Sequence, residues 1–236
     1  MKSGSAVTPP LGIRTTGQSM IDDLIDGETL EERKAFFDAV YIRADGDDSQ
    51  VPWSGENAKP EVLNWLEDNP ARNDAKALDI ATGLGEHAQA LARAGYKVTA
   101  FDLADKAIAW AKTRFPNMPE HNPVTYVGAD LFNLPEEWGQ FELVHECYTI
   151  QSLPDDLRIG AFKAIADAVA SGGTLLVYAR IRPDGSDWDQ APWPVMPSEF
   201  LRFEEAGLIK VHEVDFLRDG GRRKDIPHRF AIYRKP

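Results

Sequence analysis

Apolar residues with the spacing of β-strands alternate along the chain with runs that have the period of a helix. The strand-like segments cover residues 76–81, 97–103, 123–131, 141–148 and 174–181. Helical stripes lie between them, and one of these carries Leu84, Ala88 and Leu91 before Gly95. Strands separated by helices favour parallel pairing, so the pattern predicts an α/β fold with helices on both faces of a parallel sheet.

The N-terminal part departs from this alternation. Residues 1–18 lack apolar periodicity, and we expect them to form a loose tail. A helical stripe through Phe37, Val40 and Tyr41 follows. It predicts one or two helices that cover the core as an N-terminal cap.

The C-terminal part differs in another way. A helical stripe over 157–168 is expected to end at Gly172 and Gly173, just before the last parallel strand. Two further strand-like runs, 210–217 and 227–234, flank a glycine-containing polar turn. This arrangement is typical of a hairpin, so we expect an antiparallel strand at the C-terminal end of the sheet.

Composition is consistent with one independently folding domain. Apolar residues make up 43% of the 236 residues and charged residues 27%, which is enough for a sizeable core without a metal or disulfide. We expect a single domain over 19–236. Its parts are an N-terminal helical cap (19–70), a core (76–181), and a loop with the C-terminal hairpin (182–236).

Charge and cysteine content narrow the class of partner. Lys and Arg total 26 against 38 Asp and Glu, and the resulting net charge of −12 disfavours nucleic acid as a partner. The basic residues at 218–224 are interpreted as a solvated hairpin turn. A single cysteine, Cys147, suits a reducing compartment, and no apolar run approaches the length of a membrane span. We therefore expect a cytoplasmic protein, monomeric or homodimeric, with no membrane partner.

The first predicted strand runs directly into a glycine-containing turn, in the sequence LDIATGLGEHA. Gly83 and Gly85 stand where the backbone must approach a ligand closely and where a helix begins. The letters GLGEHA also satisfy the dinucleotide fingerprint, so the turn alone does not choose between cofactors.

Three carboxylates at the ends of successive predicted strands separate these alternatives. Asp79 lies inside the end of the first strand, where it would favour a positively charged cofactor over an anionic pyrophosphate. Asp102 ends the second strand, at the spacing expected for an acid that binds ribose hydroxyls. Asp130 ends the third and suits the exocyclic amine of adenine. The set therefore favours an adenosyl cofactor with a positive charge.

These segments resemble the class I S-adenosylmethionine-dependent methyltransferase family. LDIATGLGEHA is similar to the first motif of that family, FDL to its second, GADL to its third and FELVHECY to its fourth. The resemblance implies a Rossmann-like three-layer fold with a seven-stranded sheet. It also implies S-adenosyl-L-methionine as cofactor, with the glycine turn under its methionine part. Asp102 with Leu103 would contact the ribose, and Asp130 with Leu131 the adenine. One departure is Ala81, which stands where the family usually has a glycine.

A narrower likeness involves the segment before the core. The stretch that contains Trp53 is similar to the N-terminal aromatic segment of thiopurine S-methyltransferase and the bacterial tellurite-resistance methyltransferases. In those proteins the segment caps the cofactor. We accordingly expect Trp53 to close over the cofactor.

Candidate chemistry lies at the end of the fourth predicted strand and after the fifth. His145, Glu146 and Tyr148 share a strand end that faces the ligand crevice in open α/β sheets. We assign His145 to the cofactor, and Glu146 and Tyr148 to catalysis on a small-molecule thiol, hydroxyl or amine. Trp188 and Trp193, in a long loop, are expected to line the substrate pocket. None of the five histidines has metal-ligand spacing, so we expect no metal.

Two other functions remain open at this stage. The fingerprint GLGEHA allows an NAD(P)-dependent oxidoreductase, although Asp79 and Asp130 argue against it. A protein with the same fold that binds an adenosyl ligand without catalysis is the second alternative.

Overall fold

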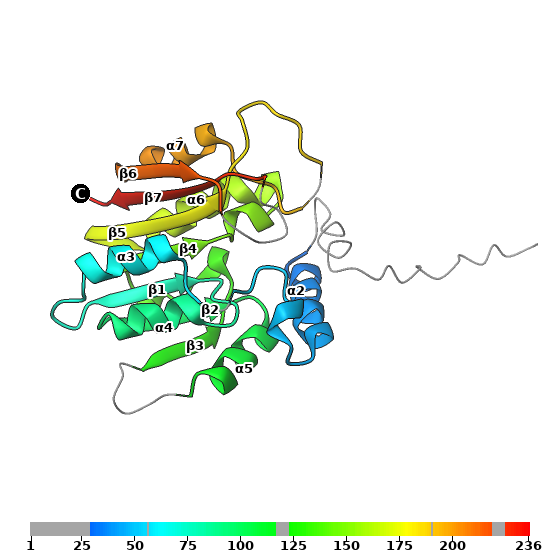
Figure 1. Cartoon of the computed structure of the whole chain (residues 1–236). Coiled ribbons are helices and arrows are strands. Elements are labelled where there is room, and N and C mark those ends of the chain that lie inside the picture. The colour runs from blue at the N-terminus through cyan, green and yellow to red at the C-terminus, as the bar shows by residue number, and fades with distance from the viewer. Residues whose placement is uncertain (1–28, 56, 117–122, 190, 219–224) are drawn as a thin grey trace, which may run out of the picture.

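The structure, a computed structural model, describes residues 29–55, 57–116, 123–189, 191–218 and 225–236. Seven strands form one sheet in the order β3-β2-β1-β4-β5-β7-β6 (Figure 1). The strands are β1 (Lys76–Ile80), β2 (Lys97–Asp102), β3 (Val124–Gly128), β4 (Phe141–Cys147), β5 (Val169–Arg180), β6 (Ile209–Phe216) and β7 (His228–Arg234). The pairs among β1 to β5 are parallel, and β7 is antiparallel to both β5 and β6. The predicted mostly parallel sheet with an antiparallel C-terminal strand is confirmed.

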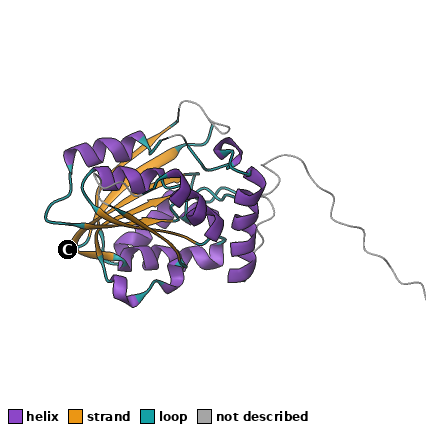
Figure 2. Ribbon diagram, turned by 90° about the horizontal axis from the view of Figure 1, so that it is seen from below, coloured by secondary structure: helices purple, strands orange, loops and turns teal. Residues whose placement is uncertain are grey.

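Helices cover both faces of the sheet (Figure 2). Apolar side chains of α3, α4 and α5 pack on one face, and those of α6 and α7 pack on the other. The helices are α2 (Leu30–Ala44), α3 (Pro60–Asp68), α4 (Glu86–Arg93), α5 (Asp105–Arg114), α6 (Asp155–Asp167) and α7 (Leu201–Glu205). Short 3-10 turns are η1 (Asp48–Gln50), η2 (Leu131–Asn133), η3 (Glu136–Trp138), η4 (Ile150–Ser152) and η5 (Pro197–Phe200). None of the helices in these described segments is both long and apolar enough to cross a bilayer.

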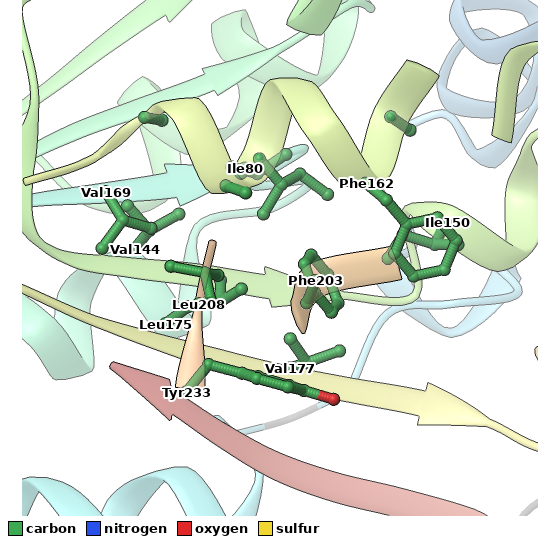
Figure 3. Packing of buried hydrophobic residues seen from close by; sticks show 14 of the residues in the cluster. Ile80, Val144, Ile150, Phe162, Val169, Leu175, Val177, Phe203, Leu208 and Tyr233 are labelled. Atoms are coloured by element: carbon green, nitrogen blue, oxygen red, sulfur yellow. The ribbon is translucent and has the colours of Figure 1, made fainter. Parts of the chain in front are cut away.

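The larger core lies between the sheet and α6. Figure 3 shows Ile80 of β1, Phe162 of α6 and Phe203 of α7 in one buried cluster, to which Val144 of β4 also belongs. Burying side chains of this size stabilises the fold by roughly 1.5–3 kcal/mol each, so the central strands form a rigid base. Several of the predicted site residues are attached to the ends of these strands.

The predicted end of the helix with the stripe over 157–168 is wrong. That helix, α6, ends at Asp167, and β5 begins two residues later at Val169. Gly172 and Gly173 lie inside the strand, where they exchange backbone hydrogen bonds with Lys235. Gly172 has a φ of +76°, so glycine is needed for a bend in the strand.

Of the predicted N-terminal cap, the structure describes α2 and the segment that follows it. α2 begins at a capping box made by Thr29 and Glu32. Its Tyr41 packs with Leu84 and Ala104 at the edge of the sheet where β1 to β5 end (Figure 1). The predicted tail at 1–18 and the glycine turn of the hairpin lie outside the described residues.

Candidate active site

A pocket opens at the carboxyl edge of the parallel strands. Its walls come from α2, the loop after α2, the turn between β1 and α4, and the residues that follow β2 to β5. Among the predicted site residues, the ones that line it are Trp53, Asp79, Ala81, Gly83, Asp102, Leu103, Asp130, Leu131, His145 and Tyr148. Residues separated by more than a hundred positions in the sequence therefore meet at one site.

The turn between β1 and α4 depends on left-handed backbone conformations. Gly83 has a φ of +56° and Gly85 a φ of +90°. Ala81, which replaces the usual glycine, also has a positive φ, of +48°. Gly85 does not line the pocket; a Cβ there would lie 2.6 Å from the hydroxyl of Tyr126 on β3. Its small size therefore serves the packing of α4 against the sheet.

Asp102 connects this turn to the end of β2. One carboxylate oxygen accepts the backbone N–H of Gly83 at 2.9 Å, and the other accepts that of Ala104 at 2.9 Å. Burial nevertheless raises the pKa of Asp102 to about 6, because the two backbone bonds offset only part of the desolvation. Each oxygen keeps a second lone pair with which it can accept a ligand hydroxyl.

Asp79 is paired with His145, which the sequence did not indicate. The two residues are direct neighbours in the register of β1 and β4, and His145 Nδ1 lies 2.7 Å from Asp79 Oδ1. The other oxygen of Asp79 accepts the hydroxyl of Thr82 at 2.6 Å. His87 lies against His145 with ring centroids 4.5 Å apart, and burial holds the pKa of His87 well below its usual range. The His145 Nε2 atom has no hydrogen-bond partner among the described residues.

The opposite side of the pocket, at the ends of β2 and β3, is mainly apolar. Leu103 and Leu131 lie there with Phe101 and Phe132. Asp130 is half-buried, and its carboxylate accepts the backbone N–H of Phe132 at 3.2 Å, which orients η2. We name these four apolar residues the apolar slot; Asp130 lies beside it.

Trp53 packs against the inner side of α2. Its indole N–H donates to the Tyr41 hydroxyl at 2.9 Å, and its ring meets those of Tyr41 and Phe37 edge to face. A Cβ on Gly83 would come within 3.9 Å of Trp53. The indole therefore lies directly over the glycine turn, and its closing over a cofactor stays a prediction.

Glu146 occupies a different place from the one expected of a catalytic acid. Its side chain is fully buried and is absent from the pocket lining. One oxygen accepts the backbone N–H groups of Thr149 and Ile150, at 2.6 and 3.1 Å. Side chains alternate along β4, so His145 and Cys147 reach the pocket and Glu146 points to the α6 side. The carboxylate therefore holds the loop that contains Tyr148.

Trp188 and Trp193 do not line the pocket either. The Trp188 indole donates to the carbonyl of Pro192, while the backbone of Trp193 bonds to Gln151 and to the guanidinium of Arg158. Among the described residues of this loop, Pro192 is the one that lines the pocket. The two tryptophans pack the loop in place, and its role as a substrate wall stays a prediction.

Basic side chains on the pocket wall were missed by the sequence argument. Arg33 of α2 and Lys59 are buried charged residues, and Arg180 follows at the end of β5. They come from segments with no recognisable motif. The one signal in the sequence was the position of Arg33, which falls on the apolar stripe of α2.

Comparison with known proteins identifies the domain. Residues 77–173, from β1 into β5, match a family model described as a methyltransferase domain. Residues 77–173 are therefore a methyltransferase domain. Both the predicted family and the predicted fold are confirmed. The narrower likeness to thiopurine S-methyltransferase stays loose, because Trp53 lies outside the matched residues.

Relatives of the methyltransferase domain include a ubiquinone biosynthesis O-methyltransferase of Xanthomonas campestris pv. campestris, 31% identical over 134 residues. That match covers 56% of this chain and 54% of the relative, so the chain spans about half the length of the curated relatives it matches.

Two solved structures share the fold. The N-methyltransferase NodS of Bradyrhizobium japonicum, in complex with S-adenosyl-l-homocysteine, has a TM-score of 0.65 at 18% identity and covers 84% of this chain and 97% of its own. The magnesium protoporphyrin IX methyltransferase of Synechocystis with bound SAM has a TM-score of 0.66 at 13% identity, with coverage of 89% and 100%.

Proposed function

We propose that this protein transfers a methyl group from S-adenosylmethionine to a small-molecule nucleophile. The observation that carries the proposal is the meeting, in one pocket, of the glycine turn with carboxylates from three strand ends. Asp79, Asp102 and Asp130 all line that pocket. A site of this kind lies where open α/β sheets bind ligands.

The acids around the glycine turn fit a sulfonium cofactor better than a dinucleotide. Dinucleotide folds place an anionic pyrophosphate at the start of the helix after the turn. Here Glu86 occupies the first turn of α4, lines the pocket and pairs with Arg114. A pyrophosphate would meet this carboxylate and Asp79, so an oxidoreductase using NAD(P) is disfavoured.

The residues that would hold the cofactor follow from their positions. Asp102 would accept the ribose hydroxyls, Asp130 would accept the adenine amine, and the apolar slot would enclose the adenine ring. The Asp79 carboxylate would face the positive end of the molecule. When bound, the cofactor supplies an electrophilic methyl group, which the acceptor takes by direct displacement.

The chain's own task is then to position the acceptor and to remove its proton. Positioning can supply roughly 7–11 kcal/mol of the barrier, without any covalent enzyme intermediate. The relatives are O-methyltransferases, which favours a hydroxyl acceptor, and a hydroxyl must lose a proton. His145 is placed for this, because Asp79 fixes its Nδ1 and leaves Nε2 without a partner among the described residues. Tyr148 stays protonated, since burial raises the pKa of its hydroxyl to about 12.

The test begins with binding of S-adenosylhomocysteine, measured by calorimetry. Charge-assisted hydrogen bonds contribute about 1.5–3 kcal/mol each, so Asp102→Ala should weaken this binding by tenfold or more. Asp74→Ala, which removes an exposed carboxylate at the opposite edge of the sheet, is the matched control. Equal affinity in the two variants would reject the ribose assignment.

Methyl transfer is tested separately, with labelled donor and a panel of small phenols, thiols and amines. His145→Gln should lower kcat at least a hundredfold while cofactor affinity changes little. If the wild-type protein binds the cofactor and methylates no member of a broad panel, the alternative of a non-catalytic adenosyl-binding protein is favoured.

A further inference from the structure

A second group of charges gathers at the ends of β4, β5 and β6: Lys59 and Arg180 line the pocket, and Arg218 reaches the hydroxyl of the pocket residue Tyr148 without lining the pocket itself. Arg180 ends β5, and Arg218 comes two residues after β6. Across the sheet, both Arg180 and Phe216 pair with His228 of β7, so the ends of β5 and β6 are at the same edge. Lys59, which precedes α3, completes the group.

Tyr148 is the centre around which these cations gather. The Lys59 ammonium lies 5.1 Å from the centroid of its ring, and the Arg180 guanidinium 5.4 Å from it. Arg218 donates to the Tyr148 hydroxyl at 3.5 Å, a long bond. Three positive charges from three segments therefore converge on one side chain that lines the pocket. We name Lys59, Arg180 and Arg218 the basic wall.

Lys59 is an unusual member, because only 6% of its surface is exposed. Among the described residues, no carboxylate lies within ion-pair distance of its ammonium. Burial lowers the pKa of Lys59, and Arg218 and Arg180 act in the same direction. Burying a cation that has no counter-charge among these residues is costly, so its retention there points to an anion that arrives with a ligand.

The positive charges of the basic wall also affect the neighbouring His228. Burial lowers the pKa of His228 to about 4, and Arg180, Arg218 and Lys59 add to this, so its imidazole stays neutral. The Tyr178 hydroxyl is buried and has no hydrogen-bond partner within the described segments. The Lys59 ammonium lies 5.8 Å from the Tyr178 ring. The charges of the wall therefore act on His228 and Tyr178, neither of which lines the pocket.

The position of the basic wall relative to the three acids identifies what it faces. In the sheet order, β3, β2 and β1 contribute Asp130, Asp102 and Asp79, and β4 follows on the other side of β1. The proposed cofactor site therefore occupies the β3-β2-β1 half of the edge. The basic wall lies in the β4-β5-β6 half, where the methyl acceptor has to lie.

From this arrangement we infer that the methyl acceptor is an acid, whose carboxylate or phosphate group binds between Lys59, Arg180 and Arg218 beside Tyr148. The inference rests on the proposed function, because it takes the cofactor half of the pocket as given. It also explains how a chain with a net charge of −12 accepts an anion, since the local cluster outweighs the distant charges.

The experiment compares acids with uncharged analogues of the same shape. Calorimetry on protein saturated with S-adenosylhomocysteine measures binding of 4-hydroxybenzoate, 4-hydroxyphenyl phosphate and 4-hydroxybenzamide. At least one acid should bind ten or more times as tightly as the amide, and whether it is the carboxylate or the phosphate identifies the anion. Lys59→Met and Arg218→Gln should each reduce this preference to threefold or less. Arg234→Gln removes an equal charge at the other end of β7 and should leave the preference unchanged.

The affinity of each variant for S-adenosylhomocysteine decides whether the wall serves the acceptor or the cofactor. Affinities within twofold of wild type support the inference. A tenfold loss in both variants, with the acid preference intact, would assign the wall to the carboxylate of the cofactor and overturn it. Equal binding of acids and amide, or no binding of any of them, also overturns it. Failure of the wild-type protein to bind S-adenosylhomocysteine would instead reject the proposed function, and the same acid and amide titrations without cofactor would still test the wall.

Discussion

Ala81, in the glycine turn, holds a backbone conformation that a residue with a Cβ does not favour. Ala81 has a φ of +48° at a position that lines the pocket. The left-handed region costs a residue with a Cβ roughly 1–2 kcal/mol, and a glycine there is free of this strain. The turn keeps its geometry because Asp102 and α4 hold the residues on either side.

Replacing Ala81 with glycine should therefore stabilise the protein. The relief of strain exceeds the greater freedom of glycine in the unfolded chain, about 0.4–1 kcal/mol, so a net gain of roughly 0.5–1 kcal/mol is expected. Urea unfolding measures it. Ala109→Gly, on the exposed side of α5, is the control and should lose about 0.5–1 kcal/mol. A loss at both positions would show that Ala81 is not strained.

Glu146 should make the stability of the protein depend on pH, because burial raises its pKa to about 7 from an ordinary 4.5. Between those pH values the folded state binds more protons than the unfolded state. Stability therefore falls as pH rises through this window, and the loss is complete above it. Glu146→Gln should abolish that loss, so the variant gains on wild type between pH 5 and 8 in urea unfolding. Glu142→Gln, exposed on the same strand, serves as control; parallel pH profiles for wild type and Glu146→Gln would refute the argument.

Among whole elements, the loop between β5 and η5 is held by one buried side chain of α6. Arg158 is 1% exposed and donates to the carbonyls of Leu153 and Trp193 and to the carboxylate of Glu199. Removing one partner of a buried ion pair leaves the other uncompensated, so Arg158→Met should cost about 3–5 kcal/mol. The double variant that also carries Glu199→Met should recover part of this lost stability. Urea unfolding of the wild type, the two single variants and the double variant gives the coupling energy between Arg158 and Glu199. Strictly additive losses would show that the two side chains do not stabilise each other.

The sequence predicted the order of helices and strands well, and the residues at which they begin and end poorly. The order of strands and helices followed from periodicity, and the hairpin of β6 and β7 from its turn residues. The end of α6 was misplaced because Gly172 and Gly173 look like a helix stop, whereas they pair with Lys235 near the chain end. Such long-range pairing has no local signal.

Among the residues of the pocket, the sequence indicated those that follow strand ends and missed those that depend on strand register or packing. The sequence brought Asp102 and Asp130 to one pocket because strand ends in a parallel sheet meet at one edge; their contacts with a cofactor stay a prediction. The bond of Asp79 to His145 depends on the register of β1 against β4, which side-chain patterns do not specify. Glu146 was assigned to catalysis because a strand end was known but not which face of the strand met the pocket. Lys59 and Arg180 belong to no motif, and three-dimensional packing alone brings them to Tyr148.

The whole molecule is strongly acidic, and this bears on the class of acceptor. With a net charge of −12, the surface repels a phosphate backbone at long range. Fluorescence anisotropy at about 0.15 M salt should detect no binding of labelled tRNA or duplex DNA, with affinity weaker than the usual non-specific range of about 10⁻⁴–10⁻⁶ M. Micromolar binding that weakens with added salt would bring nucleic acids back as acceptors.

The strand order also constrains how the protein emerges during synthesis. β6 is made before β7, yet β7 lies between β5 and β6 in the sheet. A nascent chain that has released β6 from the ribosome therefore has no neighbour for it, and its exposed Ile209, Val211 and Val214 lie on a strand with open backbone groups. Only when β7 has left the exit tunnel can β6 join the sheet through it and bring Arg218 to Tyr148. The basic wall is thus completed only after β7 has emerged, when the acid-lined half of the pocket already has all its strands.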